Sequence, residues 1–85
     1  MTKTVHIKDC ASIREALGTG PETLETTAPD VASLRDELIA RGGLYATSLA
    51  RGKAVRVAIN QTLVVETAPL VDGAEVAFFP PVTGG

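Results

Sequence analysis

The chain has 85 residues, with 8 Lys and Arg against 10 Asp and Glu and one Cys. That length allows one small domain, the balance of charge argues against a nucleic-acid binder, which needs a basic face, and a lone Cys excludes an intramolecular disulfide. No apolar run is long enough to cross a bilayer and no signal-like segment opens the chain, so we expect a cytoplasmic protein.

The first part of the chain alternates between strand and helix patterns. Residues 3–8 alternate apolar and polar side chains, which predicts a half-buried strand. Ser12 is followed three residues later by Glu15, a capping-box spacing that predicts a short helix ending at Gly18. Residues 23–27 have the composition of a second strand.

The principal helix is predicted to begin after Asp30, whose carboxylate can accept the free N–H groups of the first turn. Apolar residues recur at helical spacing over residues 31–39. Arg41 lies in the last turn, and Gly42-Gly43 ends the helix. Residues 44–50 resemble a short helical connection.

Three strand patterns bounded by turn residues occupy the rest of the domain. The strands are predicted at residues 54–59, 62–65 and 75–79. The turns are predicted at residues 51–53, 60–61, Pro69 and 72–73. The pair of strands around residues 60–61 forms a hairpin.

This order predicts an α+β fold: a β-grasp, in which a mixed sheet packs against one principal helix. The domain covers residues 1–79, and residues 80–85 form a flexible tail. A ferredoxin-like split βαβ is the alternative, but it expects a full helix before the last strand, where only residues 68–71 are available.

The tail reads Pro80-Pro81-Val82-Thr83-Gly84-Gly85. Two prolines end strand pairing and favour an extended path, on which six residues reach roughly 20 Å. Gly84 and Gly85 have no side chains, so they can pass a narrow slot and leave the terminal carbonyl unhindered. Such an end suits a carrier group: adenylation of the carboxylate, then replacement of the nucleotide by sulfur, gives a thiocarboxylate. The chain itself contributes delivery and no acid, base or metal.

The segments 57–64 and 70–85, with the ending Asp-Gly-x-Glu-Val-Ala-Phe-Phe-Pro-Pro-Val-Thr-Gly-Gly, resemble the small, sulfur-carrier subunit of molybdopterin synthase, the MoaD family. Ala11-Ser12-Ile13-Arg14-Glu15, followed by Gly18, matches that family's Ala-x-Leu-Arg-Glu-x-x-Gly. One departure is Asp9-Cys10, where the family commonly has two aromatic residues that are expected to help form the partner surface.

The resemblance implies a ubiquitin-like fold and a non-catalytic subunit of a two-protein transferase. An activating enzyme would use ATP to adenylate Gly85, and the chain itself would bind no cofactor. The tail would enter the large subunit of the synthase, in an expected heterotetramer. There the sulfur would pass to cyclic pyranopterin monophosphate and build the dithiolene of molybdopterin.

The last strand predicts an apolar docking face. Alternation directs Val76 and Phe78 into the core, and Ala77 and Phe79 to the open side of the sheet. Exposed contiguous apolar surface usually marks an interface. The expected partner-binding residues are therefore Phe79, Leu63, Ala77, Pro80, Pro81, Val82 and Thr83, joined by Arg14 from the resemblance; a solvated helix face explains Arg14 equally well.

Other residues have plainer explanations. Cys10 is expected to be a small apolar filler rather than a persulfide carrier, and His6 a surface residue. The cluster of Arg51, Lys53 and Arg56 fits a solvated surface as well as an anion site. Three functional alternatives stay open: a stand-alone carrier of the thiamine type, a ubiquitin-like modifier of lysines, and a non-covalent binding domain.

Overall fold

The structure is a computed structural model and describes residues 2–8 and 22–79. The predicted short helix after Ser12, the departure at Asp9-Cys10 and the tail lie outside the described residues. The elements within them are β1 (Lys3–Lys8), β2 (Glu22–Thr26), α2 (Val31–Ala40), α3 (Gly43–Ser48), β3 (Arg56–Ile59), β4 (Thr62–Val64) and β5 (Glu75–Phe79). Each agrees with a predicted element to within about two residues.

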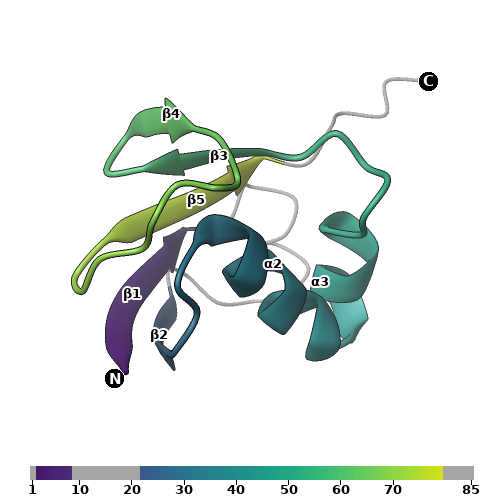
Figure 1. Cartoon of the computed structure of the whole chain (residues 1–85). Coiled ribbons are helices and arrows are strands. Elements are labelled where there is room, and N and C mark those ends of the chain that lie inside the picture. Colours follow the sequence, from purple (N-terminus) through teal and green to yellow (C-terminus); the bar gives the residue numbers. More distant parts are fainter. Residues whose placement is uncertain (1, 9–21, 80–85) are drawn as a thin grey trace.

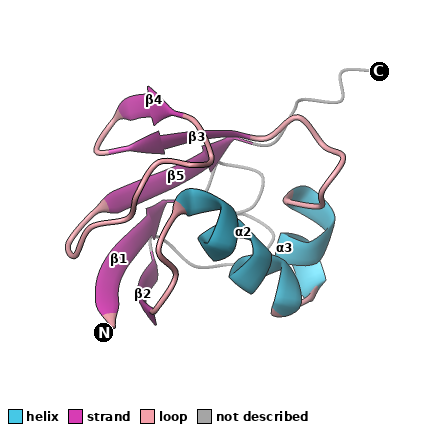
Figure 2. Cartoon of the chain, in the orientation of Figure 1, coloured by secondary structure: helices cyan, strands magenta, loops and turns pink. Residues whose placement is uncertain are grey.

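The strands form one five-stranded sheet in the order β2-β1-β5-β3-β4. β1 and β5 pair in parallel, and the other three pairs are antiparallel. Figure 1 shows α2 and α3 together on one side of this sheet, and the layers are also clear in Figure 2. This is the predicted β-grasp, and the split βαβ alternative is wrong because residues 60–79 contain no helix.

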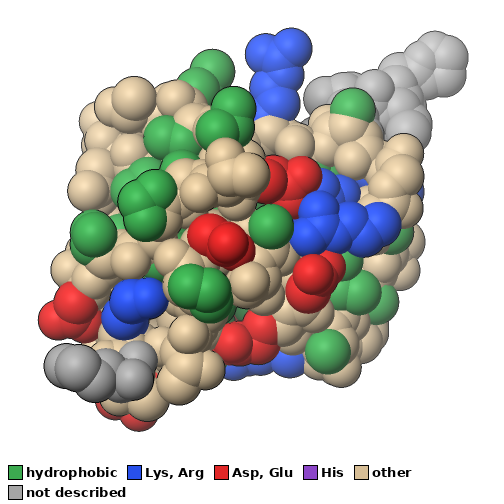
Figure 3. Space-filling view, in the orientation of Figure 1, with side chains coloured by type: hydrophobic (Ala, Val, Ile, Leu, Met, Phe, Trp, Pro, Cys, Tyr) green, Lys and Arg blue, Asp and Glu red, His purple; other side chains and the backbone are tan. Residues whose placement is uncertain are grey.

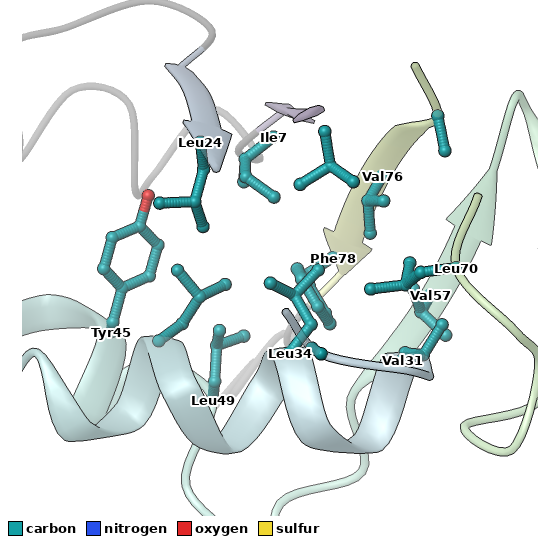
Figure 4. Packing of buried hydrophobic residues seen from close by; sticks show 14 residues of the cluster. Ile7, Leu24, Val31, Leu34, Tyr45, Leu49, Val57, Leu70, Val76 and Phe78 are labelled. Atoms are coloured by element: carbon teal, nitrogen blue, oxygen red, sulfur yellow. The ribbon is translucent and has the colours of Figure 1, made fainter. Parts of the chain in front are cut away.

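The core lies between the helical side of the sheet and α2. Val5, Ile7, Val76 and Phe78 turn toward the helices and are at most 2% exposed. Leu34 and Leu38 of α2 pack among them, and Figure 4 shows the side chains meeting from both layers. Each such fully buried side chain contributes roughly 1.5–3 kcal/mol, so this thin core depends on few residues.

The N-cap of α2 is as predicted, whereas Arg41, predicted in the last turn, is the C-cap residue after Ala40. The Ser33 backbone N–H donates to the Asp30 Oδ1 atom at 2.8 Å, and this hydrogen bond is the main cause that lowers the pKa of Asp30 below its ordinary value. The Arg41 backbone N–H closes the last turn on the carbonyl of Leu38. Gly42 then takes a φ of 81°, a left-handed conformation that glycine adopts readily.

The β3–β4 hairpin turns at Asn60 and Gln61, with φ of 50° and 70°. Two consecutive positive φ angles are the requirement of a type I′ turn, which matches the twist of the strands it joins. Asn60 also fixes this turn to β5: its backbone N–H donates to the Glu75 carbonyl at 2.8 Å, and its side-chain oxygen accepts from the Glu75 N–H at 3.0 Å. The hairpin is therefore held in register with the central strand.

Pro69 differs from its prediction as a turn residue. It forms an isolated antiparallel bridge with Asp30, and the turn lies just before it, at residues 66–67. The Leu70 N–H donates to the Pro29 carbonyl at 3.0 Å, so this segment runs extended beside the start of α2. Proline is compatible with such an edge because its missing N–H is not needed for the bridge.

A buried arginine holds the connection between α3 and β3. Arg35 is 3% exposed, and its guanidinium donates to the carbonyls of Leu49 and Ala50 at 2.7 Å and of Lys53 at 3.2 Å. Its Nη1 lies 3.3 Å from Glu66. Burial of a charge is tolerated only when it is paired and hydrogen-bonded, and this guanidinium meets both conditions.

Candidate functional site

The open side of the sheet carries a row of side chains in register across four strands. Lys8 of β1 lies beside Ala77 of β5, Ala77 beside Ala58 of β3, and Ala58 beside Leu63 of β4. Residues that face each other across paired strands point to the same side of a sheet. The short side chains of Ala77 and Ala58 lie on β5 and β3, the two middle strands of this row. The longer side chains of Lys8 and Leu63 lie at its two ends, so the surface is lower at the middle of the row.

A shallow hollow of about 350 Å³ follows from this row. Phe79 closes one side of it, and Gln61 and Glu75 close the other. Leu63 is 61% exposed and Phe79 is 45% exposed. We call this surface, formed by Lys8, Ala58, Gln61, Leu63, Glu75, Ala77 and Phe79, the open-face hollow. Exposed large apolar side chains around a hollow are typical of a protein-docking surface.

The predicted assignment of faces on β5 is confirmed. Val76 and Phe78 are buried in the core, whereas Phe79 is exposed and Ala77 is half-buried on the open side. Leu63 is exposed on the same side, and Val65, just after β4, is 71% exposed. Three of the predicted partner-binding residues thus lie together around one hollow, and their role in binding stays a prediction.

A second hollow, of about 320 Å³, lies at the end of the β3–β4 hairpin that is away from its turn. Leu63 borders both hollows, and Arg56, Val65 and Glu66 contribute to the second one. Arg56 is exposed and pairs in register with Phe79. The two hollows therefore meet at Leu63, and Arg56 of the second one lies beside the end of β5, the strand that leads into residues 80–85.

Ion pairs neutralise much of the charge near this surface. Lys8 Nζ lies 3.3 Å from Glu75 Oε1 at the border of the open-face hollow. Arg51 Nε contacts Asp36 at 2.9 Å and Arg51 Nη1 contacts Glu66 at 2.7 Å. The hydrogen bond to Asp36 is the main cause that raises the pKa of Arg51. The guanidinium of Arg51 is therefore already paired with the carboxylates of Asp36 and Glu66, which argues against its binding a separate anion.

Other site classes find little support in the described part of the chain. Residues 2–8 and 22–79 contain no group of three His, Cys, Asp or Glu side chains placed to hold a metal ion. Their helices are too short to span a bilayer. On the face in Figure 3, basic and acidic side chains are interspersed, unlike the continuous basic face of a nucleic-acid binder.

The remaining predicted residues divide into two groups. His6 is exposed, as predicted, and its Nδ1 lies 3.2 Å from the Thr23 hydroxyl. Outside the described residues lie Cys10, Arg14, Pro80, Pro81, Val82, Thr83, Gly84 and Gly85. The sequence did not predict Lys8, Ala58, Gln61 and Glu75 as members of the hollow, because their neighbourhood depends on the pairing of strands far apart in the chain.

Comparisons with known proteins identify similar chains. The model of the ThiS family matches residues 10–85. The molybdopterin synthase sulfur carrier subunit of Escherichia coli (strain K12) is 47% identical over 75 residues, which cover 88% of this chain and 91% of that protein.

Two solved structures are similar in fold. One is a chain from the protein–protein complex of subunits 1 and 2 of the molybdopterin-converting factor of Helicobacter pylori 26695, with a TM-score of 0.62 and 29% identity. The comparison covers 96% of this chain and 99% of that one. The other is Caldiarchaeum subterraneum ubiquitin, at a TM-score of 0.61 and 18% identity over the full length of both chains, which shows the fold alone.

Proposed function

The chain belongs to the ThiS family and, within it, to the sulfur carrier subunits of molybdopterin synthase, and on this basis we propose that it carries sulfur as a thiocarboxylate at Gly85. It serves molybdenum cofactor biosynthesis. The large subunit of the synthase accepts the tail, and the sulfur passes to cyclic pyranopterin monophosphate to form the dithiolene of molybdopterin.

The chemistry explains why an activating enzyme is needed. The carboxylate of Gly85 is ionised at neutral pH, with an ordinary pKa of about 3.5, and is a poor electrophile. Transfer of AMP from ATP to this carboxylate, with loss of pyrophosphate, makes it an acyl donor. Hydrosulfide then adds to the carbonyl carbon, AMP leaves with the electrons of the broken C–O bond, and loss of the sulfhydryl proton leaves a thiocarboxylate. ATP is bound by the activating enzyme, and this chain binds no cofactor.

One observation carries the proposal: the position of β5. This strand lies between β1 and β3 at the middle of the sheet, and it ends at Phe79, six residues before Gly85. Six extended residues span roughly 20 Å. The fold therefore holds the root of the tail on a rigid support beside the open-face hollow, which is what delivery into a partner's active site requires.

The partner surface follows from the same geometry. Phe79, Leu63 and Ala77 meet around the hollow, and a partner that receives the tail must cover the surface at its root. The large subunit and the activating enzyme both receive the tail, so both would use this surface. Pro80, Pro81, Val82 and Thr83 would line the partner's channel, Gly84 would pass its narrowest part, and Arg14 would add a peripheral contact in a cytoplasmic heterotetramer.

The intact mass of the protein, purified from its own host, tests the proposal. A fraction of the molecules is expected to be heavier by the difference between one sulfur and one oxygen, with the change located at Gly85. Removal of Gly85 should abolish molybdopterin formation in a reconstituted synthase and leave the melting temperature unchanged. Normal product formation without Gly85 contradicts the proposal. Attachment of Gly85 to lysines of other proteins, without the thiocarboxylate, indicates a modifier instead.

A further inference from the structure

Arg56 differs from the other arginines that the structure describes. Arg35 binds three backbone carbonyls and Glu66, Arg41 binds Glu22 at 3.0 Å, and Arg51 binds Asp36 and Glu66. Arg56 is exposed, and residues 2–8 and 22–79 offer its guanidinium neither a hydrogen bond nor an ion pair. Among the arginines of the described residues, Arg56 is thus the one whose guanidinium has no partner there.

Arg56 lies beside the end of β5, next to the surface that a partner of the tail would cover. It pairs in register with Phe79 and therefore lies on the open side of the sheet, where β5 leads into the tail. The exposed side chains of Leu63 and Val65 border the same hollow as Arg56. Arginine is the cation best suited to an apolar interface, because its planar guanidinium is weakly hydrated and can bind a carboxylate through two parallel hydrogen bonds.

The nearby acidic residue does not neutralise it. Glu66 borders the hollow with Arg56, but its Oε1 lies 2.7 Å from Arg51 and 3.3 Å from Arg35. Lys53, three residues before Arg56, is also exposed and has no carboxylate partner in the described part of the chain. Within the described residues, Arg56 and Lys53 are therefore exposed cations without a carboxylate partner, in a chain whose net charge is −2.

We propose that Arg56 is a specificity-determining contact for the large subunit, whose docking surface carries an Asp or Glu side chain that binds this guanidinium at the rim of the apolar interface. The inference rests on the proposed function and adds the chemistry of its partner. The apolar side chains bury area without distinguishing partners, whereas an unpaired cation at the rim favours an acidic surface and opposes a basic one.

The test is a titration of the full chain against its own large subunit at two ionic strengths. Arg56→Gln and Thr47→Glu each change the net charge by −1, but Thr47 is exposed on α3, on the other side of the sheet, and serves as the matched control. At about 0.1 M salt, Arg56→Gln is expected to raise Kd by about tenfold, Arg56→Lys by less, and Thr47→Glu by less than about twofold. At about 1 M salt, where the screening length falls to about 3 Å, the loss for Arg56→Gln should shrink to a small factor.

Each outcome has a definite meaning. If Arg56→Gln binds the large subunit as tightly as the unmodified chain does at low salt, the inference is wrong. A loss that is the same at both ionic strengths also overturns it, because a packing effect would then explain the result. Weaker binding to the activating enzyme alone assigns the carboxylate to that enzyme and rejects the proposal as stated. Failure of the unmodified, thiocarboxylated chain to bind or transfer sulfur refutes the proposed function instead, so the two failures are separable.

Discussion

Phe78 and Phe79 are neighbours on β5 that face opposite sides of the sheet, and their truncation to Ala separates stability from binding. Phe78 is 2% exposed and Phe79 is 45% exposed. Phe78→Ala removes a ring enclosed by the core and leaves a cavity, which typically costs about 3–5 kcal/mol. Phe79→Ala opens onto solvent and leaves no closed cavity.

The magnitudes follow from these exposures. A domain of this length has a free energy of unfolding of about 4–13 kcal/mol, so Phe78→Ala removes a large share of it. Since 1 kcal/mol shifts the melting temperature by about 4–8 °C at this size, the fall should be at least about 12 °C. Full burial of a Phe side chain contributes about 1.5–3 kcal/mol. Phe79 is somewhat more than half buried, so its truncation should cost only about 1 kcal/mol.

Binding is expected to respond in the opposite order. At the centre of an interface an aromatic residue can contribute 2 kcal/mol or more, which raises Kd by about thirtyfold on truncation. We therefore expect Phe79→Ala to weaken binding to the large subunit and to the activating enzyme by about that factor. Both proteins must cover the surface at the root of the tail.

Urea denaturation of the two variants and a titration against each partner, below the melting temperature of both, would test this. Each Kd is corrected for the folded fraction of the variant. If Phe79→Ala lowers the urea midpoint as far as Phe78→Ala does, while Kd per folded molecule stays unchanged, Phe79 belongs to the core and the assignment of the docking face is wrong.

Three further predictions concern the tail, the buried cation and the helix cap. Gly84→Leu should block passage of the tail and stop sulfur transfer at an unchanged melting temperature; equal loss of both, or of neither, contradicts the threading role. Arg35→Met should lower the free energy of unfolding by about 3 kcal/mol, because three backbone carbonyls lose their donor and Glu66 keeps only its contact with Arg51; a change below about 1 kcal/mol in urea denaturation would show that water replaces the guanidinium. The lowered pKa of Asp30 means that its cap contributes above its ordinary pKa of 3.8 and is lost as pH falls through the folded value. The gap in urea midpoint between the unmodified chain and Asp30→Ala should therefore be constant near neutral pH and narrow only as pH falls below 3.8; a gap that narrows already above that pH refutes the assignment.

Local features of this fold were predictable because their causes are local. The alternation of Val76, Ala77, Phe78 and Phe79 identifies the buried face of β5 without any knowledge of its neighbours. Asp30 accepts the Ser33 N–H as its place before an apolar helical stripe predicts.

Other features depend on residues far apart in the chain. No single strand shows that Ala58 and Ala77 lie side by side and make the open-face hollow, because their register is set by the pairing of β3 with β5. The burial of Arg35 was not predicted, although a signal existed: it lies four residues after Val31, on the apolar side of α2. Its acceptors are carbonyls of another segment, which the spacing of helix residues cannot reveal.

The central position of β5 also has a mechanical consequence. A partner that draws in the tail pulls on Phe79 along the axis of β5, and this strand is bonded on one side to β1 and on the other to β3. Backbone hydrogen bonds run across the strands, so such a force loads both ladders in shear, with many bonds sharing it. An edge strand such as β4 would instead be peeled from the sheet one bond at a time. The domain can therefore be held by its tail without unravelling from the end that is gripped.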